Sequence, residues 1–206
     1  MPIKPALIKL LPRSFYLRKD VLKIARDLLG KYLVTQFEGI STSGMITETE
    51  AYEGITDRAS HAYGNRKTDR TRVMYYEGGV AYVYLCYGIH SLFNIVTNNE
   101  GIPHAILIRA IVPAEGIDVM LSRAGKPRIA ADIGTGPGKV SKLLGIHYSA
   151  SGMDICQKPK ARTEAGIWIE DRGVLIQKSK ILSTPRIGVD YAGEDSLLPY
   201  RFLIAK

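Results

Sequence analysis

Two glutamates lie where a strand could use them for acid–base chemistry. Glu48 and Glu50 are two residues apart in "GMITETEAYE", a segment with strand character, so their side chains should project from the same face. Two carboxylates held close together and partly buried raise the pKa of one of them, as a general base near neutrality requires. The same spacing also fits a solvent-facing strand edge that carries two acids, and the pattern alone favours this plainer interpretation.

Arg109 is the more informative charged residue, because it interrupts the otherwise apolar run "HAILIRAIV". A buried guanidinium is costly unless it meets an anion. The sequence leaves the partner open: it could be Glu50, a phosphate or both. An ion pair that only stabilises the fold is nearly as well supported.

Basic residues are concentrated in two segments. Residues 58–72 and residues 123–142 each hold five Lys or Arg and one Asp, a local balance of +4 in both cases. The second segment contains "TGPGKVSK", whose glycines could free backbone amides for a phosphate near a helix N-terminus, although it is not a Walker A loop. Two basic loops fit a surface that tracks a nucleic-acid backbone, and a pair of solvated loops is the alternative.

Aromatic residues accompany the acids and the first basic segment. A tyrosine has a flat stacking face and a hydroxyl group, which suits an extruded base, although a single tyrosine in a strand usually belongs to the core and a single histidine is usually structural. The residues concerned are Tyr52, His61, Tyr82, Tyr84 and Tyr87.

The stretch "VAYVYLCYGIHSLFNIV" predicts a β-hairpin, and its register can be specified. With a three-residue loop at residues 87–89, Tyr82 pairs with Asn94 and Tyr84 pairs with Leu92. Those two tyrosines and Asn94 then share one face, and Tyr87 is left at the tip. A two-residue turn would instead place Asn94 on the face opposite Tyr84.

The remaining chain predicts one α+β domain over residues 1–206: a compact unit with a mainly antiparallel curved sheet, flanking helices and a protruding hairpin. Residues 20–31 form an amphipathic helix, with Asp20 as its cap and Gly30 as its end. A helix begins at Pro113, and a glycine-rich loop enters another at about Lys139. Residues 1–13 are predicted to form a loose N-terminal arm. The predicted strands of the first half are residues 31–38 and 44–53, joined by a turn at 39–44, and those of the last quarter are 166–171, 173–181, 184–191 and 200–205.

Composition limits the possible partners and compartments. The formal net charge of +8 favours a polyanionic partner, nucleic acid before membrane, although a charge that only maintains solubility is equally compatible. Cys86 and Cys156 form no CxxC pair, which suits a reducing cytoplasm and argues against a zinc site. No signal peptide or membrane-spanning run is evident, and no ligand spacing predicts a metal.

Three segments together resemble the alkyladenine (3-methyladenine) DNA glycosylase family, and its bacterial branch most closely. They are "ITETEAYEGITDRASHAYGNRKTDRTRVMY", "AYVYLCYGIHSLFNIVT" and "AILIRAIVPAEG", in family order. The resemblance implies a monomeric, cofactor-free, monofunctional glycosylase in the bacterial cytoplasm. It would flip alkylated purines such as 3-methyladenine, or deaminated purines, out of double-stranded DNA and hydrolyse the N-glycosidic bond, which starts base excision repair.

The resemblance also implies a role for each matching residue. Glu50 would deprotonate the attacking water and Arg109 would help to position it, whereas Glu48 would be an outer or surface acid. The base pocket would consist of Tyr52, His61, Tyr84 and Asn94, with Asn94 discouraging normal guanine; Tyr87 would intercalate into the DNA, and Tyr82 would be structural. Independently of the resemblance, the two basic segments predict contacts to the DNA backbone from Arg66, Arg70, Arg72, Lys139 and Lys142.

Two alternatives remain at this point. A non-catalytic nucleic-acid-binding domain would use the basic loops and aromatics but would not need Glu50 beside Arg109. A bifunctional glycosylase/lyase could use Pro2 as a secondary amine after removal of Met1. The distance between Glu50 and Arg109 discriminates the first alternative from a hydrolase.

Overall fold

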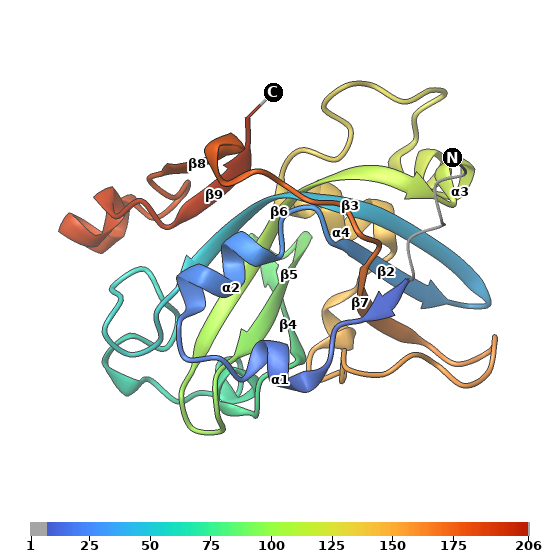
Figure 1. Cartoon of the computed structure of the whole chain (residues 1–206). Coiled ribbons are helices and arrows are strands. Elements are labelled where there is room, and N and C mark those ends of the chain that lie inside the picture. The colour runs from blue at the N-terminus through green and yellow to red at the C-terminus, as the bar shows by residue number, and fades with distance from the viewer. Residues whose placement is uncertain (1–7, 206) are drawn as a thin grey trace.

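The computed structural model describes residues 8–205 and contains a curled antiparallel sheet with helices against it (Figure 1). The strands run in the order β1-β7-β2-β3-β6-β5-β4, and β9 pairs with both β3 and β8. The prediction of an α+β fold with a mainly antiparallel curved sheet is confirmed. The strands are β1 Lys9–Leu10, β2 Tyr32–Phe37, β3 Ile40–Tyr52, β4 Val80–Cys86, β5 His90–Thr97, β6 His104–Glu115, β7 Gly166–Asp171, β8 Ile181–Thr184 and β9 Arg201–Ile204.

The helices are short, and the predicted amphipathic helix is present. Its side-chain cap is Asp20, which accepts a hydrogen bond of 2.8 Å from the backbone N–H of Lys23, and the chain turns at Gly30 with φ +81°. The α-helices are α1 Arg13–Tyr16, α2 Val21–Asp27, α3 Ile117–Ala124 and α4 Pro137–Leu144, and the 3₁₀ turns are η1 Tyr63–Asn65, η2 Arg72–Tyr75, η3 Tyr148–Ala150, η4 Lys178–Lys180 and η5 Asp190–Leu197.

The core lies where α2 and α4 pack against the sheet (Figure 1). Ile24 and Leu28 of α2 are fully buried, and burial of an aliphatic side chain of this size is worth about 1.5–3 kcal/mol. Thr49 points toward α2, because its Oγ1 donates a 3.0 Å hydrogen bond to the carbonyl of Ala25. Since side chains alternate along a strand, Glu50 faces away from this helix.

The turn predicted at residues 39–44 is shorter than expected. Glu38 and Gly39 both have positive φ angles and form a tight two-residue connection, and Ile40 already belongs to β3. Gly44 lies inside β3, where a Cβ would come within 2.6 Å of Ile111 Cδ1. This glycine therefore allows β3 and β6 to approach closely, which a turn-based interpretation of the sequence missed.

The helix predicted from Pro113 begins later. Pro113 belongs to β6 and pairs with Gly44, and α3 starts only after Gly116, which has φ +70°. A proline in a strand is tolerated where its missing N–H is not required. By contrast, α4 begins at Pro137, two residues before the predicted start at about Lys139.

The last quarter contains fewer strands than predicted. Residues 166–171 and 201–204 are strands, but residues 173–180 lack strand pairing and end in η4, and the short β8 covers only Ile181–Thr184. Residues 185–189 form an irregular loop in place of the predicted strand at 184–191. Apolar residues in this region are spaced like those of strands, yet the loop serves to cover the end of β3.

The predicted hairpin register is confirmed. Tyr82 pairs with Asn94 and Tyr84 with Leu92, and the connection at residues 87–89 has three residues. Tyr87 adopts φ 51° at the start of the loop and is 92% exposed.

The start of the described chain is more ordered than predicted. Lys9 and Leu10 pair with β7, Leu11 is buried, and Arg13 already begins α1. The loose arm predicted for residues 1–13 is therefore wrong for residues 9–13, and residues 1–7 lie outside the described part. Within residues 8–205, no helix is long and apolar enough to cross a membrane.

Candidate active site

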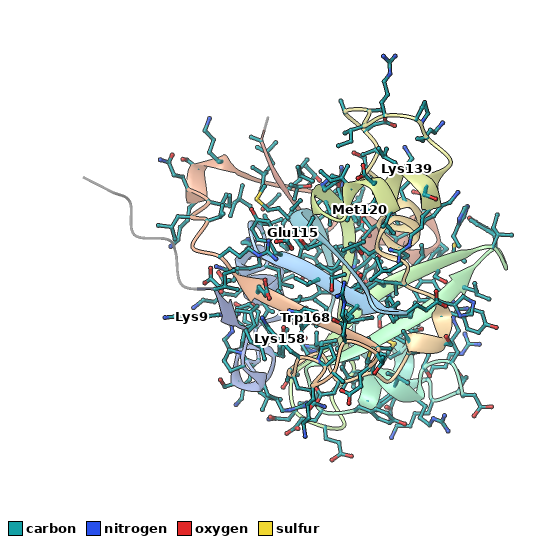
Figure 2. The ribbon with its side chains drawn as sticks, turned by 90° about the vertical axis from the view of Figure 1, so that its right-hand side faces the viewer. Lys9, Glu115, Met120, Lys139, Lys158 and Trp168 are labelled. Atoms are coloured by element: carbon teal, nitrogen blue, oxygen red, sulfur yellow. The ribbon has the colours of Figure 1, made fainter. Side chains whose placement is uncertain are left out.

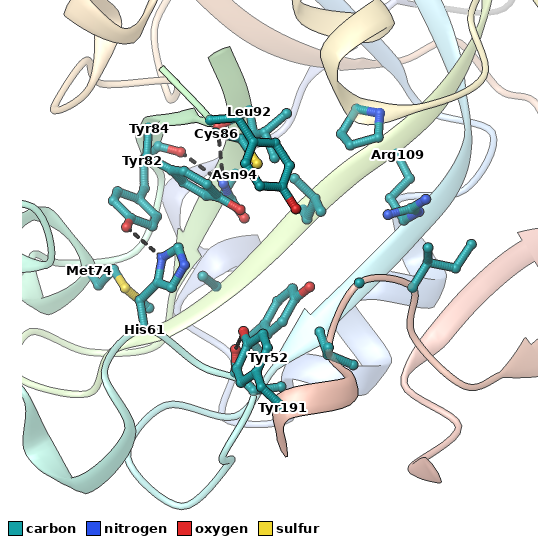
Figure 3. A pocket seen from close by; sticks show the side chains of 18 residues that line it. Tyr52, His61, Met74, Tyr82, Tyr84, Cys86, Leu92, Asn94, Arg109 and Tyr191 are labelled. Atoms are coloured by element: carbon teal, nitrogen blue, oxygen red, sulfur yellow. Dashed lines mark hydrogen bonds between the residues drawn. The ribbon is translucent and has the colours of Figure 1, made fainter. Parts of the chain in front are cut away.

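A cavity of about 250 Å³ opens beside the β4–β5 hairpin (Figure 3). Tyr52 and Tyr191 lie on one side of it, and Tyr82, Tyr84 and His61 lie across from them. The volume is near the lower end of the range of small-molecule pockets. The remaining walls are Ala59, Met74, Cys86, Tyr87, Leu92, Asn94, Ala105, Leu107, Arg109, Pro137, Ile187, Gly188 and Val189.

Glu50 lies directly behind the cavity wall and is fully buried. Its Oε2 accepts a 2.8 Å hydrogen bond from the Tyr52 hydroxyl, and its Oε1 accepts a 2.8 Å hydrogen bond from the backbone N–H of Ile187. Arg109 Nη1 lies 3.4 Å from the same Oε1. All three of these contacting residues line the cavity, so the carboxylate lies immediately behind that lining.

The pKa of the Glu50 carboxyl is raised above its ordinary value of 4.5. Burial is the largest cause, and it outweighs the opposing effects of Arg109, the Ile187 N–H, the Tyr52 hydroxyl and Arg186. A carboxylate that binds its proton more tightly than a solvated one is a better general base.

Arg109 owes its orientation to irregular strand pairing. Glu48 pairs with Ala110 and Thr49 with Ile108, so Arg109 has no direct partner on β3 at this register shift. Such bulges commonly re-aim a side chain. The Arg109 Nε donates a 2.9 Å hydrogen bond to Glu48, and its Nη1 faces Glu50.

Glu48 is not a surface acid. Its side chain is buried, and its Oε1 accepts from Arg109 Nε at 2.9 Å and from Arg201 Nε at 2.6 Å. The solvent-facing interpretation of the two glutamates is wrong, and the anion closest to Arg109 is Glu48 rather than Glu50. The two acids and two arginines form one alternating charge network.

Arg186 completes the site and was missed by sequence reasoning. Its guanidinium is buried, forms an ion pair through both terminal nitrogens with Asp57, and donates a 2.9 Å hydrogen bond to the carbonyl of Ala51. It also lies 4.8 Å from the ring centre of Tyr52. Arg186 therefore holds the loop whose next residue, Ile187, donates to Glu50.

The predicted base-pocket residues Tyr52, His61 and Tyr84 do lie together. The rings of His61 and Tyr84 meet edge-on with centroids 4.7 Å apart, and His61 Nδ1 lies 2.9 Å from the Tyr82 hydroxyl. Burial, with smaller effects of Arg70 and Arg66, lowers the pKa of His61 to about 4. The imidazole is therefore neutral at pH 7. Tyr82, predicted to be structural, both packs in the core and lines the cavity.

Asn94 is held by the hairpin itself. Its Nδ2 donates 3.2 Å hydrogen bonds to the carbonyls of Tyr82 and Leu92, which fixes the amide against the cavity wall (Figure 3). Tyr87 lies at the cavity mouth but extends into solvent.

The predicted backbone-contacting residues fall into two groups. Arg66 and Arg70 line a cleft that shares His61 with the cavity, and Arg70 also lines a neighbouring cleft together with Arg72 and Tyr84. Lys139 and Lys142 line a third cleft near α4, and Figure 2 shows Lys139 far from Lys9 and Lys158. Lys139 forms a 2.7 Å ion pair with Asp132. Among residues 8–205, no three His, Cys, Asp or Glu side chains gather in a way that could hold a metal ion.

Comparison with known proteins gives a consistent match. The family model described as "Methylpurine-DNA glycosylase (MPG)" matches residues 14–206. A protein of Chlamydia felis named "Putative 3-methyladenine DNA glycosylase" is 46% identical over 198 residues, covering 95% of this chain and 96% of its own. One of Methanocella arvoryzae with the same name is 45% identical over 192 residues, covering 93% and 90%.

Proposed function

Because the chain belongs to the methylpurine-DNA glycosylase family, a family of N-glycosidic hydrolases, we propose that it excises alkylated purines such as 3-methyladenine from double-stranded DNA. The base is flipped into the aromatic cavity, and a water activated by Glu50 hydrolyses the bond. The observation that carries this proposal is the buried Glu50 carboxylate behind a tyrosine-lined cavity, in contact with Tyr52, Arg109 and Ile187.

The proposed reaction uses the raised pKa of Glu50. As the bond between C1′ and the purine nitrogen breaks, the base keeps the electron pair and the sugar acquires oxocarbenium character. The water oxygen bonds to C1′, and its proton passes to Glu50. The carboxylate therefore both activates the water and stabilises the developing positive charge.

Arg109 positions the reacting groups in this proposal. Its Nη1 lies 3.4 Å from Glu50 Oε1, while its Nε is occupied by Glu48. The shared guanidinium leaves one donor edge on the cavity side, where it can orient a water beside the carboxylate. Arg109 lowers the pKa of Glu50, but it does not cancel the larger effect of burial.

The cavity walls suit a flipped, alkylated base. Alkylation at a ring nitrogen makes a purine cationic, and tyrosine faces attract cations. Departure of such a base leaves it neutral, so no protonation of the leaving group is required. Flipping costs a few kcal/mol, and less for a damaged base, so some selection precedes the chemistry.

The proposal extends to the oligomeric state, the compartment and the DNA contacts of the enzyme. The enzyme acts as a monomer on DNA in the bacterial cytoplasm, without a metal or other cofactor, and the DNA backbone is contacted by Arg66, Arg70, Arg72, Lys139 and Lys142. Asn94 opposes normal guanine by meeting its exocyclic amino group. A purely nucleic-acid-binding role is disfavoured by the 3.4 Å approach of Arg109 to Glu50.

The direct test uses duplex DNA treated with a methylating agent. We expect the protein to release 3-methyladenine and to leave abasic sites, with the same rate in the presence of EDTA. Failure to release any alkylated purine would disprove the proposal.

Pro2, the amine of a lyase mechanism, lies outside the described residues, and borohydride trapping of a protein–DNA adduct would be needed to support that mechanism.

Tyr87→Ala should separate flipping from folding. The side chain is 92% exposed, so the melting temperature should stay within error of the wild type. Without an aromatic wedge to occupy the gap in the stack, excision should fall about tenfold or more. The measurement is a single-turnover rate on a single-lesion duplex, with Leu175→Ala, 90% exposed, as the matched control. Full activity of Tyr87→Ala would rule out the wedge.

The pH dependence of excision should report Glu50. The ionised form is the active base, so the single-turnover rate should rise with pH through a pKa above 4.5. The same shift has the opposite effect on folding: between the unfolded-state and folded-state pKa values the native protein binds more protons, so this group's contribution to stability falls as pH rises. A rate that is flat across the acidic range would contradict the assigned base.

A further inference from the structure

Two aromatic side chains separate the base cavity from a neighbouring cleft. The cavity has a volume of about 250 Å³ and the cleft has one of about 520 Å³. Of the residues that the structure describes, just His61 and Tyr191 line both spaces. These two rings therefore form the partition between them.

The His61 side of the partition is fixed by the hairpin. His61 Nδ1 lies 2.9 Å from the Tyr82 hydroxyl, and its ring meets that of Tyr84 edge-on with centroids 4.7 Å apart. Tyr82 is buried in the core, so it cannot follow a displaced imidazole. A base that needs more room can therefore gain little on this side.

The Tyr191 side of the partition is attached by its hydroxyl group. Tyr191 is 69% exposed, and its hydroxyl donates a 3.0 Å hydrogen bond to the carbonyl of Ala59. Ala59 is itself buried, and its N–H donates a 2.9 Å hydrogen bond to Asp57. The backbone N–H of Arg58 also donates a 2.8 Å hydrogen bond to Asp195, which ties the same 3₁₀ turn η5 to the same loop. An exposed tyrosine is thus held in one position in the partition.

The partition faces one particular edge of a flipped base. Figure 3 shows His61 and Arg109 at opposite ends of the cavity. In the proposed reaction the glycosidic nitrogen lies near Glu50 and Arg109, so the Watson–Crick edge, on the far side of the purine, points toward His61 and Tyr191. A substituent on that edge meets the partition before it can reach the cleft.

We propose that Tyr191 is a specificity-determining residue, which limits how far a lesion can extend beyond the Watson–Crick edge of the flipped purine. The inference rests on the proposed function. The methyl group of 3-methyladenine lies on the sugar side of the ring and does not approach the partition, whereas an additional ring on the far edge meets the Tyr191 side chain. Removal of that side chain joins the cavity to the cleft, which then accommodates the additional ring.

The test compares lesions that differ in bulk along this edge. Single-lesion duplexes carry hypoxanthine, ethenoadenine, whose additional ring spans the Watson–Crick edge, or ethenoadenine with a methyl group on that ring. Single-turnover rates are measured for the wild type, for Tyr191→Ala, and for Tyr191→Phe, which keeps the ring but loses the bond to Ala59. Tyr63→Ala is the matched control, because Tyr63 is also exposed and lines the cleft but not the cavity.

The quantity compared is the rate on each ethenoadenine divided by the rate on hypoxanthine. A general effect on the fold or on base stacking changes all of these rates alike and leaves their ratio unchanged. One methylene group in a closely fitting pocket changes specificity about 10–200-fold. The ratio for methylated ethenoadenine should therefore rise about tenfold or more in Tyr191→Ala, rise less in Tyr191→Phe, and match the wild type in Tyr63→Ala.

Unchanged ratios in Tyr191→Ala, or an equal rise in Tyr63→Ala, would overturn the role given to Tyr191. In both of those cases release of 3-methyladenine from methylated duplex by the wild type would still support the proposed function. A wild type inactive on that duplex would overturn the proposed function instead.

Discussion

Glu50→Gln should abolish excision while leaving the fold and DNA binding largely intact. Glutamine has the same shape, and its side-chain oxygen can still accept the hydrogen bond from the Ile187 N–H. What it loses is the ability to take a proton and the negative charge opposite the oxocarbenium-like sugar. General-base catalysis alone contributes about 10²–10⁴-fold, so the rate should fall by at least that factor. The measurement is release of 3-methyladenine from methylated duplex, with DNA binding measured in parallel.

Glu53→Gln is the matched control for that experiment. Glu53 lies just beyond the end of β3, is partly buried, and accepts a 3.3 Å hydrogen bond from the Tyr200 hydroxyl. It does not line the cavity. Its replacement should leave the excision rate within a few-fold of the wild type. Unchanged excision by Glu50→Gln would disprove the mechanism, whereas equal losses in both variants would point to a general effect on the fold.

The predictions from the sequence were most accurate where the local residue pattern indicates the same buried face that the fold requires. The hairpin register follows from the alternation of Tyr82, Tyr84 and Asn94, because a one-residue slip would place Asn94 on the face opposite the two tyrosines. The helix at Asp20 follows from a cap and an apolar face. The shared site of Glu50 and Arg109 could be inferred because an arginine inside an apolar strand requires an anion.

What the sequence could not predict depends on contacts between distant residues. Glu48 looked like a surface acid because Arg201, its second partner, lies 153 residues further along the chain. Gly44 and Pro113 resembled turn and helix signals, yet they face each other across β3 and β6. A glycine or proline that resembles a turn or helix signal is ambiguous until the neighbouring strand is known.

Arg186 is the clearest omission, and it differs from Arg109 in its local sequence. Arg109 stands out in a run of aliphatic residues, whereas Arg186 follows a proline and precedes "IGVDY", so nothing nearby signals burial. Its partner Asp57 is 129 residues away. Both residues are buried, and the ion pair between them connects the 57–59 turn to the loop before η5. Such a connection can be recognised only in three dimensions.

Arg186→Met should cause the largest loss of stability among the changes considered, because it leaves Asp57 buried without a counter-charge. Removing one member of a buried pair costs about 3–5 kcal/mol. Among residues 8–205, Asp57 then keeps only the backbone N–H groups of Glu53 and Ala59 as hydrogen-bond donors. The free energy of unfolding is obtained from urea denaturation, and a value within about 1 kcal/mol of the wild type would contradict the role given to this pair.

The double variant Asp57→Asn/Arg186→Met distinguishes the two roles of Arg186. Neutralising Asp57 removes the unpaired charge, so a large part of the lost stability should return. Excision should not return with it, because residues 186–189 would still lack the bonds to Ala51 and Asp195 that hold the Ile187 N–H against Glu50. Recovery of stability without recovery of the single-turnover rate would therefore identify Arg186 as a positioning residue of the site. Recovery of both would limit it to a stabilising ion pair.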